Sequence, residues 1–360
     1  MAAAPSHFSF KVKGQEGAIP SSGFGTATLH GEACYAAVRS AIAAGYRHID
    51  SAMLYSNHEP VGRAVRDAIA AGEVTRAQLW VTTKVAFFPA DADGANTWVP
   101  GVVTTWQPEN TKATAPAGVD LALAELGLEY VDLLLIHNPC TDTRRVEGDY
   151  EASSFPHCFE LAASRLRPDE REAVLARRLA AVAVDAAAAE ASRAAAWRAL
   201  EAARAAGKAR FIGVSNYPPA LVRAMAAYAT VEPAVNQVEF HPRCAWPRLR
   251  EHASAAGMAL SAYGSGNSVA LEKSPVVARV AAERGSTPLA TVLRWTLQKG
   301  VAVHPRTGTP AHMAANLAAA AEPPLAPEHE AALDALNANW PYYWWAMPLL
   351  PKGAVPELEL

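Results

Sequence analysis

Asp50, Lys84 and His137 each end a short apolar segment, and Tyr55 follows Asp50 by five residues. Some of these residues also have an ordinary structural interpretation. Asp50 could cap a helix, Tyr55 could be a half-buried ring with a satisfied hydroxyl, and a histidine after an apolar strand is often a core residue. In a barrel of alternating strands and helices, however, the carboxyl ends of the strands carry the chemistry. Three successive segments that end in an acid, a lysine and a histidine, with a tyrosine nearby, therefore indicate a common site.

These four side chains would suit the reduction of a carbonyl group, whose oxygen must gain a proton when its carbon accepts a hydride. A tyrosine hydroxyl is a poor proton donor at neutral pH, because its ordinary pKa is about 10. A neighbouring ammonium group lowers this pKa, so Lys84 would activate Tyr55. Asp50 would keep Lys84 charged, since an unpaired buried ammonium is costly. A neutral His137 could then orient and polarise the carbonyl oxygen.

The chain alternates between strand-like and helix-like patterns, which fits a barrel of strands and helices. Expected strands cover residues 46–49, 79–84, 130–136, 210–216, 233–237, 258–262 and 301–303. Expected helices cover residues 31–44, 59–72, 115–127 and 287–299. Residues 8–20 predict a β-hairpin before the first barrel strand. Residues 23–26 favour a tight turn, and they lack the GxGxxG spacing of a dinucleotide fingerprint.

Composition narrows the class of protein. The chain has 360 residues, of which 51% are hydrophobic and 19% charged, so we expect one domain over residues 1–360 with a large core. A net charge of −3 gives no basic surface for nucleic acid or membrane lipid. The expected partners are small molecules, with no obligate protein partner and no metal. Four sparse cysteines without CxxC spacing, and no signal or membrane-spanning segment, indicate a cytoplasmic protein.

Most of the chain, from about residue 23 to residue 340, resembles the aldo-keto reductases, and residues 45–62 are similar to the first signature of that family. The catalytic tetrad of the family falls on the four residues described above. The resemblance implies a (β/α)₈ TIM barrel without a Rossmann domain, here with an N-terminal β-hairpin and long βα-loop insertions. It also implies NADPH-dependent reduction of an aldehyde or ketone to the alcohol, with Tyr55 as proton donor and NADH as a possible cofactor.

The resemblance assigns cofactor contacts after the strands. Ser215, Asn216 and Gln237 would bind the nicotinamide carboxamide, although each alone could equally cap the following helix. Tyr263 would stack on the nicotinamide ring. The other expected cofactor contacts are Gly25, Thr26, Asp50, Ser265, Arg306, Thr307, His312 and Asn316.

The expected phosphate site shows departures from the family. Arg306 and Thr307 match positions where the family holds the 2′-phosphate of NADPH, usually with lysine and serine, and arginine suits phosphate. His312 stands where the family often has arginine, and Ala315 where it often has glutamate. Residues 264–267 also differ from the usual Ser-Pro-Leu of the pyrophosphate loop. NADPH remains the expected cofactor, with less discrimination against NADH than a complete motif would give.

Two insertions are expected, at about residues 87–114 and 140–193. The second continues into Ala-rich sequence that predicts one or two extra helices. The last part of this sequence, with Trp197 and Leu200, should belong to the barrel. The rest could be a solvated helix or a lid over the site.

The expected substrate contacts are Tyr55, His137, Asn138 and Trp344. Trp344 belongs to an aromatic run in a C-terminal loop and tail at about residues 338–360. This run could clamp the tail onto the core, or it could border a bulky or aromatic substrate. Where the family commonly has tryptophan, this chain has Ala27, Ala86 and Asn138, which should enlarge the pocket or leave room for the insertions.

Two other functions stay open at the level of sequence. The barrel could bind a nicotinamide nucleotide as a sensor or structural subunit, since a fold alone does not ensure turnover. It could also act as an NAD-dependent alcohol dehydrogenase in the reverse direction, which cofactor preference would distinguish. The intact tetrad argues against a sensor.

Overall fold

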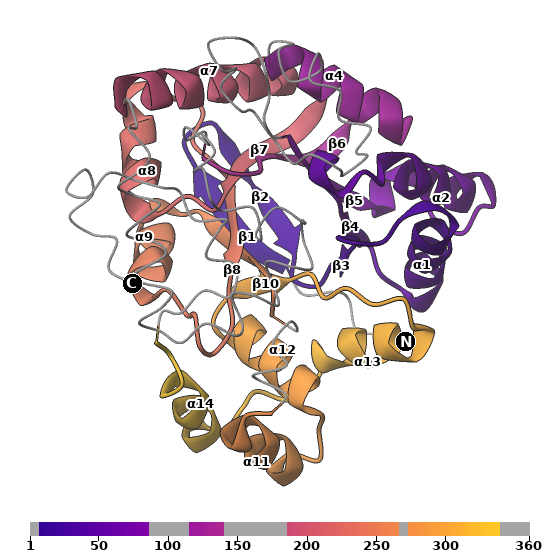
Figure 1. Cartoon of the computed structure of the whole chain (residues 1–360), viewed down its shortest axis with the longest axis vertical. Coiled ribbons are helices and arrows are strands. Elements are labelled where there is room, and N and C mark those ends of the chain that lie inside the picture. The colour runs from indigo at the N-terminus through magenta and orange to yellow at the C-terminus, as the bar shows by residue number, and fades with distance from the viewer. Residues whose placement is uncertain (1–6, 86–114, 140–185, 266–272, 339–360) are drawn as a thin grey trace, which may run out of the picture.

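A computed structural model describes residues 7–85, 115–139, 186–265 and 273–338 of the chain. In these residues, eight parallel strands form one sheet in which each strand pairs with the next one along the chain. A parallel bridge between Ser22 and Val303 joins the two ends of the sheet, so the sheet closes into a barrel (Figure 1). The strands are β3 (Phe24–Gly25), β4 (His48–Asp50), β5 (Trp80–Val85), β6 (Val131–Ile136), β7 (Ala209–Ser215), β8 (Val235–Glu239), β9 (Ala259–Tyr263) and β10 (Val301–Val303).

Helices surround the barrel (Figure 1). They are α1 (Gly31–Ala44), α2 (His58–Ala70), α4 (Ala115–Leu126), α7 (Ala186–Ala205), α8 (Pro219–Ala224), α9 (Pro247–Ala256), α11 (Pro275–Glu283), α12 (Pro288–Gln298), α13 (Pro310–Ala319) and α14 (Pro327–Asp334). Short 3-10 turns are η1 (Met53–Tyr55), η2 (Arg76–Gln78) and η4 (Met225–Ala227). Every residue of β5 and β6 is buried, as expected for strands with the barrel core on one side and helices on the other. The predicted (β/α)₈ barrel is confirmed.

The N-terminal hairpin covers the amino end of the barrel. Its strands β1 (His7–Val12) and β2 (Gln15–Pro20) pair antiparallel, and Gly14 in the turn between them has a left-handed φ of 81°. Phe10 and Ile19 pack against the first residues of barrel strands, among them Trp80 and Val235. The predicted hairpin is therefore present, and the strand-end residues lie at the opposite end of the barrel.

The predicted strands and helices match the observed ones to within two residues at either end, apart from one segment. Residues 23–26 were expected to form a tight turn, and this expectation was wrong. Phe24 and Gly25 form β3 and pair with Ile49 and Asp50 of β4. A strand of two residues is too short to show the alternation of apolar and polar positions that identifies longer strands.

The last part of the predicted Ala-rich helical region is α7. Its side chains Trp197 and Leu200 are fully buried in the main core cluster, which confirms that this part belongs to the barrel. Trp197 Nε1 also donates a hydrogen bond to the carbonyl oxygen of Val231 at 3.0 Å.

Several predictions concern segments outside the described residues. These are the insertion at 87–114, residues 140–185 of the second insertion, and the tail from residue 339. The expected extra helices before α7, the lid and the aromatic run of the tail therefore stay predictions. None of the helices that the structure describes is long and apolar enough to cross a membrane.

Gly62 on α2 lies so close to α4 that no side chain fits between the two helices. A Cβ atom at this position would overlap the carbonyl oxygen of Leu126, a backbone atom that cannot rotate away. We expect Gly62→Ala to lower the free energy of unfolding by about 1–3 kcal/mol, measured by urea denaturation followed by circular dichroism.

Gly308→Ala is the matched control, because among the described residues no heavy atom lies within 4 Å of the Cβ position there. The stability of this variant should change by about 0.5 kcal/mol or less. Equal stability of the two variants would contradict the close contact between α2 and α4.

Candidate active site

Three neighbouring strands bring the candidate residues to one end of the barrel. Asp50 is the last residue of β4, Lys84 lies near the end of β5, and His137 directly follows β6. Because β4 pairs with β5 and β5 pairs with β6, these strand ends are adjacent. The backbone N–H of His137 donates to the carbonyl oxygen of Val85 at 2.9 Å, which extends the pairing of β5 and β6 to the site itself.

Tyr55 lies at the same end of the barrel, at the end of the turn η1 that follows β4, and hydrogen bonds of Asn57 hold this turn in place. Asn57, which is fully buried, accepts a hydrogen bond from Ser51 Oγ at 2.8 Å. Its side-chain amide donates to the carbonyl oxygens of Thr26 and Leu29 at 2.8 Å and 3.0 Å, so it ties the turn to the loop after β3. Sequence reasoning missed Asn57. Its place just before α2 suggests an ordinary helix cap, although its side chain makes no capping bond.

Lys84 is the centre of the cluster. Its fully buried ammonium donates to Asp50 Oδ1 at 2.7 Å, to the carbonyl oxygen of Ser51 at 3.0 Å and to Tyr55 Oη at 3.3 Å. The other carboxylate oxygen of Asp50 accepts a hydrogen bond from Gln237 Nε2 at 2.8 Å. All three ammonium protons therefore have acceptors, and the carboxylate is held from both sides.

The Lys84–Asp50 pair is ionised in spite of its burial. Burial is the largest effect and opposes the negative charge of Asp50, but the Lys84 ammonium, His304 and the hydrogen bond from Gln237 together hold the pKa of Asp50 below its ordinary value. Burial likewise opposes the positive charge of Lys84, but the Asp50 carboxylate raises the pKa of Lys84 above its ordinary value. Both shifts favour the ammonium–carboxylate pair at neutral pH.

Tyr55 corrects one expectation from the sequence, namely that Lys84 would bring its pKa below the ordinary value. Burial is the largest effect and raises the pKa of Tyr55, while the Lys84 ammonium lowers it by less, so that the pKa lies above its ordinary value. The expectation was wrong in direction because a sequence pattern reveals the charged neighbour but not the depth of burial. The hydroxyl is protonated at neutral pH, and Lys84 acts on the phenolate only as that charge forms.

His137 faces Tyr55 across the site. The two rings have centroids 5.7 Å apart and planes at 84°. Burial, with a smaller contribution from the Lys84 ammonium, lowers the pKa of His137 to about 3, so the imidazole is neutral at pH 7. Within the described part of the chain, its Nδ1 has no hydrogen-bond partner. This ring can therefore donate one hydrogen bond and accept another without carrying charge.

Ser215 at the end of β7, Asn216 after it and Gln237 on β8 form one hydrogen-bonded group. Ser215 Oγ and the backbone N–H of Asn216 both donate to the carbonyl oxygen of Gln237, at 2.7 Å and 2.9 Å. Asn216 has a left-handed φ of 61°, which asparagine adopts more readily than most residues. Since Gln237 also holds Asp50, this group is fixed directly to the buried ion pair.

The side chain of Asn216 links this group to the His137 side of the site. Its amide nitrogen lies 3.1 Å from the carbonyl oxygen of His137, 2.9 Å from Asn138 Oδ1 and 3.2 Å from Ser215 Oγ. Tyr263 Oη donates to Asn216 Oδ1 at 2.7 Å. Because an amide has only two protons for these three acceptors, one of the contacts can be exchanged for a ligand.

Three further residues expected to contact a cofactor hold loops in place. A Cβ atom at Gly25 would lie 2.6 Å from the carbonyl oxygen of His304, so the backbones approach too closely there for a side chain. Thr26 Oγ1 donates to the carbonyl oxygen of Asp50 at 2.9 Å. Ser265 Oγ donates to the carbonyl oxygen of Phe240 at 3.0 Å.

The residues expected at a phosphate group lie after β10 and on α13. Arg306 is exposed and Thr307 is half-buried, with Thr307 Oγ1 accepting a hydrogen bond from the backbone N–H of Thr309 at 3.1 Å. On α13, His312 is exposed and Asn316 is buried. The structure therefore keeps the guanidinium of Arg306 at the surface, where an anionic ligand can reach it. Trp344 lies outside the described residues.

This arrangement can transfer a proton to a ligand. Tyr55 Oη carries the proton, Lys84 can stabilise the phenolate that remains, and Asp50 keeps Lys84 charged. His137 adds a neutral hydrogen-bonding ring beside the tyrosine. Groups of this kind act in general acid catalysis when a substrate oxygen gains negative charge.

Known proteins of one family are similar to this chain along nearly its whole length. A model of the Aldo/keto reductase family matches residues 22–338. The rat protein named Aldo-keto reductase family 1 member A1 is 30% identical over 335 residues, covering 90% of this chain and 88% of that protein. D-galacturonate reductase of Hypocrea jecorina is 32% identical over 302 residues, covering 83% and 82%. NAD(P)H-dependent D-xylose reductase of Scheffersomyces stipitis is 30% identical over 305 residues, covering 81% and 82%.

A solved structure supports the same fold. The crystal structure of a Bombyx mori aldo-keto reductase in complex with NADP is similar with a TM-score of 0.69 and a sequence identity of 24%. The match covers 98% of this chain and 100% of that one.

The buried Lys84–Asp50 pair leads to a stability prediction. Asp50→Asn removes the counter-charge of a fully buried ammonium and should lower the free energy of unfolding by about 3–5 kcal/mol at pH 7. The double variant Asp50→Asn/Lys84→Met should be less destabilised than the sum of the two single variants, because it leaves no unpaired charge. Urea denaturation of the four proteins measures this coupling.

The coupling should also depend on pH. The lowered pKa of Asp50 contributes stability above its ordinary value of about 4, and this contribution is lost as the pH falls through the pKa in the folded protein. The raised pKa of Lys84 contributes below about 10.5 and is lost as the pH rises through its folded value. A coupling that is absent at pH 7, or that grows at either extreme, would contradict the ionised pair.

Proposed function

Because the chain belongs to the aldo/keto reductase family, we propose that Tyr55 supplies the proton when this enzyme reduces its substrate. The protein is an NAD(P)H-dependent oxidoreductase that converts the carbonyl group of an aldehyde or ketone into an alcohol. The observation that carries the proposed role is the chain of contacts from Tyr55 Oη to Lys84 Nζ, at 3.3 Å, and from Lys84 Nζ to Asp50 Oδ1, at 2.7 Å.

In the proposed reaction, the nicotinamide supplies a hydride to the carbonyl carbon, and the protein provides the proton. The substrate oxygen accepts the proton of Tyr55 Oη. The phenolate that remains is stabilised by the Lys84 ammonium, which is already fixed by Asp50 and the backbone before the reaction begins. This arrangement requires no reorganisation as charge develops, which is the main source of electrostatic catalysis.

His137 is proposed to position the substrate oxygen. Its ring is neutral at pH 7, since its pKa is about 3, and it stands beside the tyrosine ring with centroids 5.7 Å apart. A neutral imidazole can donate a hydrogen bond to the carbonyl oxygen without repelling the Lys84 ammonium. Asn138, which is half-buried and bonded to Asn216, is the proposed neighbouring substrate contact.

The nicotinamide end of the cofactor is proposed to lie against Ser215, Asn216, Gln237 and Tyr263. The residues fit a carboxamide, because they present hydroxyl and amide groups on adjacent strand ends and one contact of Asn216 is exchangeable. Other proposed cofactor contacts are Gly25, Thr26, Asp50, Ser265, Thr307, His312 and Asn316.

The 2′-phosphate of NADPH is proposed to bind Arg306, whose guanidinium is exposed after β10. A planar guanidinium can form two parallel hydrogen bonds with a phosphate group. NADH lacks this phosphate, so Arg306 would not strengthen its binding. NADPH is therefore the proposed preferred cofactor.

Further properties are proposed from composition. The chain is proposed to form a single domain that works in the cytoplasm without an obligate protein partner. Sparse cysteines support a reducing compartment, and within the described residues Cys34 and Cys244 are free and buried.

Tyr55→Phe should reduce turnover of a carbonyl substrate by about 10²-fold to 10⁴-fold, because it removes the proton donor. NADPH binding, measured by quenching of protein fluorescence, should change little. Tyr35→Phe removes the same hydroxyl from a half-buried tyrosine on α1 that donates to Asp67 at 2.8 Å, and it should keep full activity. Unchanged turnover of Tyr55→Phe would exclude the proposed role, and NADPH binding by the wild type without reduction of any carbonyl compound would favour a sensor.

Arg306→Ala should raise the KM for NADPH by about tenfold or more, because one charge-assisted contact with the 2′-phosphate is lost. The KM for NADH should change by less than about twofold, since NADH lacks that phosphate. Arg279→Ala is the charge-matched control, because Arg279 is exposed and pairs with Glu283 on α11. An equal rise of both KM values in Arg306→Ala would contradict phosphate recognition by this residue.

A further inference from the structure

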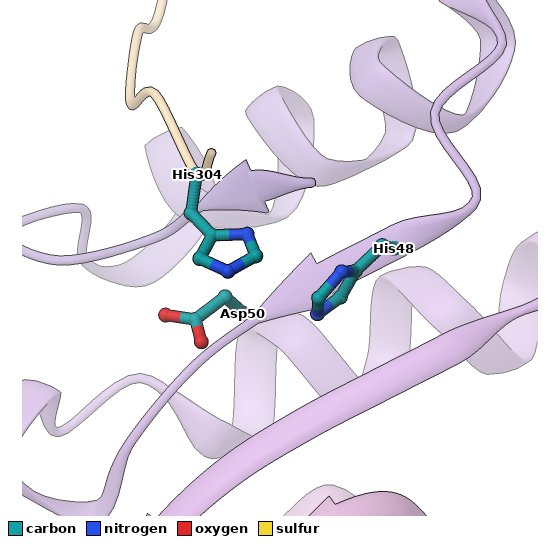
Figure 2. A group of neighbouring side chains, drawn as sticks. All are labelled: His48, Asp50 and His304. Atoms are coloured by element: carbon teal, nitrogen blue, oxygen red, sulfur yellow. The ribbon is translucent and has the colours of Figure 1, made fainter. Parts of the chain in front are cut away.

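Three side chains that could bind a metal ion meet inside the barrel, next to the ion pair. His48 lies two residues before Asp50 on β4, and His304 follows β10 on the other side of β3. One ligating atom from each of the three side chains lies within 4.8 Å of the other two. Figure 2 shows the His304 ring above Asp50 and the His48 ring to the right of it, with the carboxylate of Asp50 pointing to the left.

The His48 and His304 rings can lie this close together because the residue before β3, Gly23, has no side chain. A Cβ atom at Gly23 would lie 2.5 Å from His304 Nδ1 and 3.0 Å from His48 Nδ1, so a side chain there would press on both rings. The rings have centroids 4.6 Å apart and planes at 70°. The absence of a side chain at Gly23 therefore lets both rings lie against the backbone of this residue, with one nitrogen of each ring facing it.

His304 is buried without the bonds that a buried imidazole normally makes. It is 8% exposed, and among the described residues neither of its ring nitrogens has a hydrogen-bond partner. An unsatisfied buried polar group is energetically costly, so such groups in folded proteins usually have a ligand, an ion or a water as partner. His48 is oriented, since its Nε2 lies 2.9 Å from Thr82 Oγ1.

We propose that His48, His304 and Asp50 form a binding site for a divalent transition-metal ion of the zinc type. Two imidazoles and one carboxylate are a common set of three protein ligands for zinc, with the fourth position left to water. Imidazole ligands select against magnesium and calcium, which prefer oxygen.

The distances require only a small closure around the ion. Ligands that bind zinc tetrahedrally at about 2.0–2.1 Å lie roughly 3.4 Å from one another. Separations of up to 4.8 Å therefore have to shrink by about 1–1.5 Å, which side-chain rotation at three residues can supply. The Lys84 ammonium, which would repel the ion, lies 2.7 Å from Asp50 Oδ1.

Binding of the ion should inhibit the reductase, and this consequence rests on the proposed function. The carboxylate of Asp50 already bonds Lys84 on one oxygen and Gln237 on the other, so an ion at Asp50 has to weaken one of these bonds. The positive charge of the ion also repels the Lys84 ammonium. Either effect disturbs the group that stabilises the Tyr55 phenolate.

The site is tested by binding of zinc ions to the full chain, measured by isothermal titration calorimetry with zinc chloride. Cobalt(II) is a second probe, because its visible absorption reports a tetrahedral site directly. Wild type should bind one more ion than His304→Leu. His252→Leu is the matched control, since His252 on α9 also has a buried ring nitrogen without a partner in the described part of the chain, and it should bind as wild type does.

Gly23→Ala provides a second test that keeps all three ligands. Its methyl group would press on the Nδ1 atoms of both rings and move them apart, so this variant should also lose one ion. Circular dichroism would establish that both variants are folded. Equal binding by wild type and folded His304→Leu would overturn the site.

Turnover tests the inhibition separately, with the rate of each protein compared with its own rate in the presence of a chelator. Zinc should inhibit wild type and His252→Leu at least tenfold more strongly than His304→Leu. Equal inhibition of all three proteins would overturn the inhibitory role. A wild type without turnover in the chelator would contradict the proposed function, while the binding measurements would still decide on the site.

Discussion

The buried bond between Lys84 and Asp50 is the constraint on which the rest of the site depends. Two opposite charges removed from water are stable only when they stay together and when their remaining hydrogen-bonding positions are filled. The barrel meets this condition by placing the pair on adjacent strands and by adding the carbonyl oxygen of Ser51 and the amide of Gln237. The hydroxyl of Tyr55 is the third hydrogen-bond acceptor of Lys84, so the group proposed to donate the proton also helps to stabilise the buried ion pair.

Much of the fold was readable from the sequence because strands buried on both faces are continuous apolar runs that end at polar residues. This signal located β4, β5 and β6 to within two residues, and the residues after them fell at one end of the barrel. The candidate site was readable for the same reason: a parallel barrel gathers all strand ends of one polarity. The resemblance to a known family then connected residues that are far apart in the sequence, such as Asp50 and Gln237, which the structure joins at 2.8 Å.

The properties that could not be predicted from the sequence are those that depend on how deeply a side chain is buried in the folded protein. The pKa of Tyr55 has the opposite shift from the one expected, because desolvation outweighs the ammonium beside it. Asn57 looks like a helix cap in sequence but holds three partners in the loops around Tyr55. His304 follows an apolar strand just as His137 does, but it was not among the predicted site residues, and only the structure places it against His48 beside Gly23, which has no side chain.

Gly23 and His304 have a consequence for how this barrel can evolve. A side chain at position 23 and an imidazole at position 304 would occupy the same volume, since the Cβ of one would lie 2.5 Å from the Nδ1 of the other. A side chain at 23 would also press on His48, whose Cγ would lie 2.9 Å from the same Cβ, so a larger residue at 23 requires both rings to move or to be replaced. The packing of one glycine against two histidines therefore makes the residue types at three positions, far apart in the chain, depend on one another.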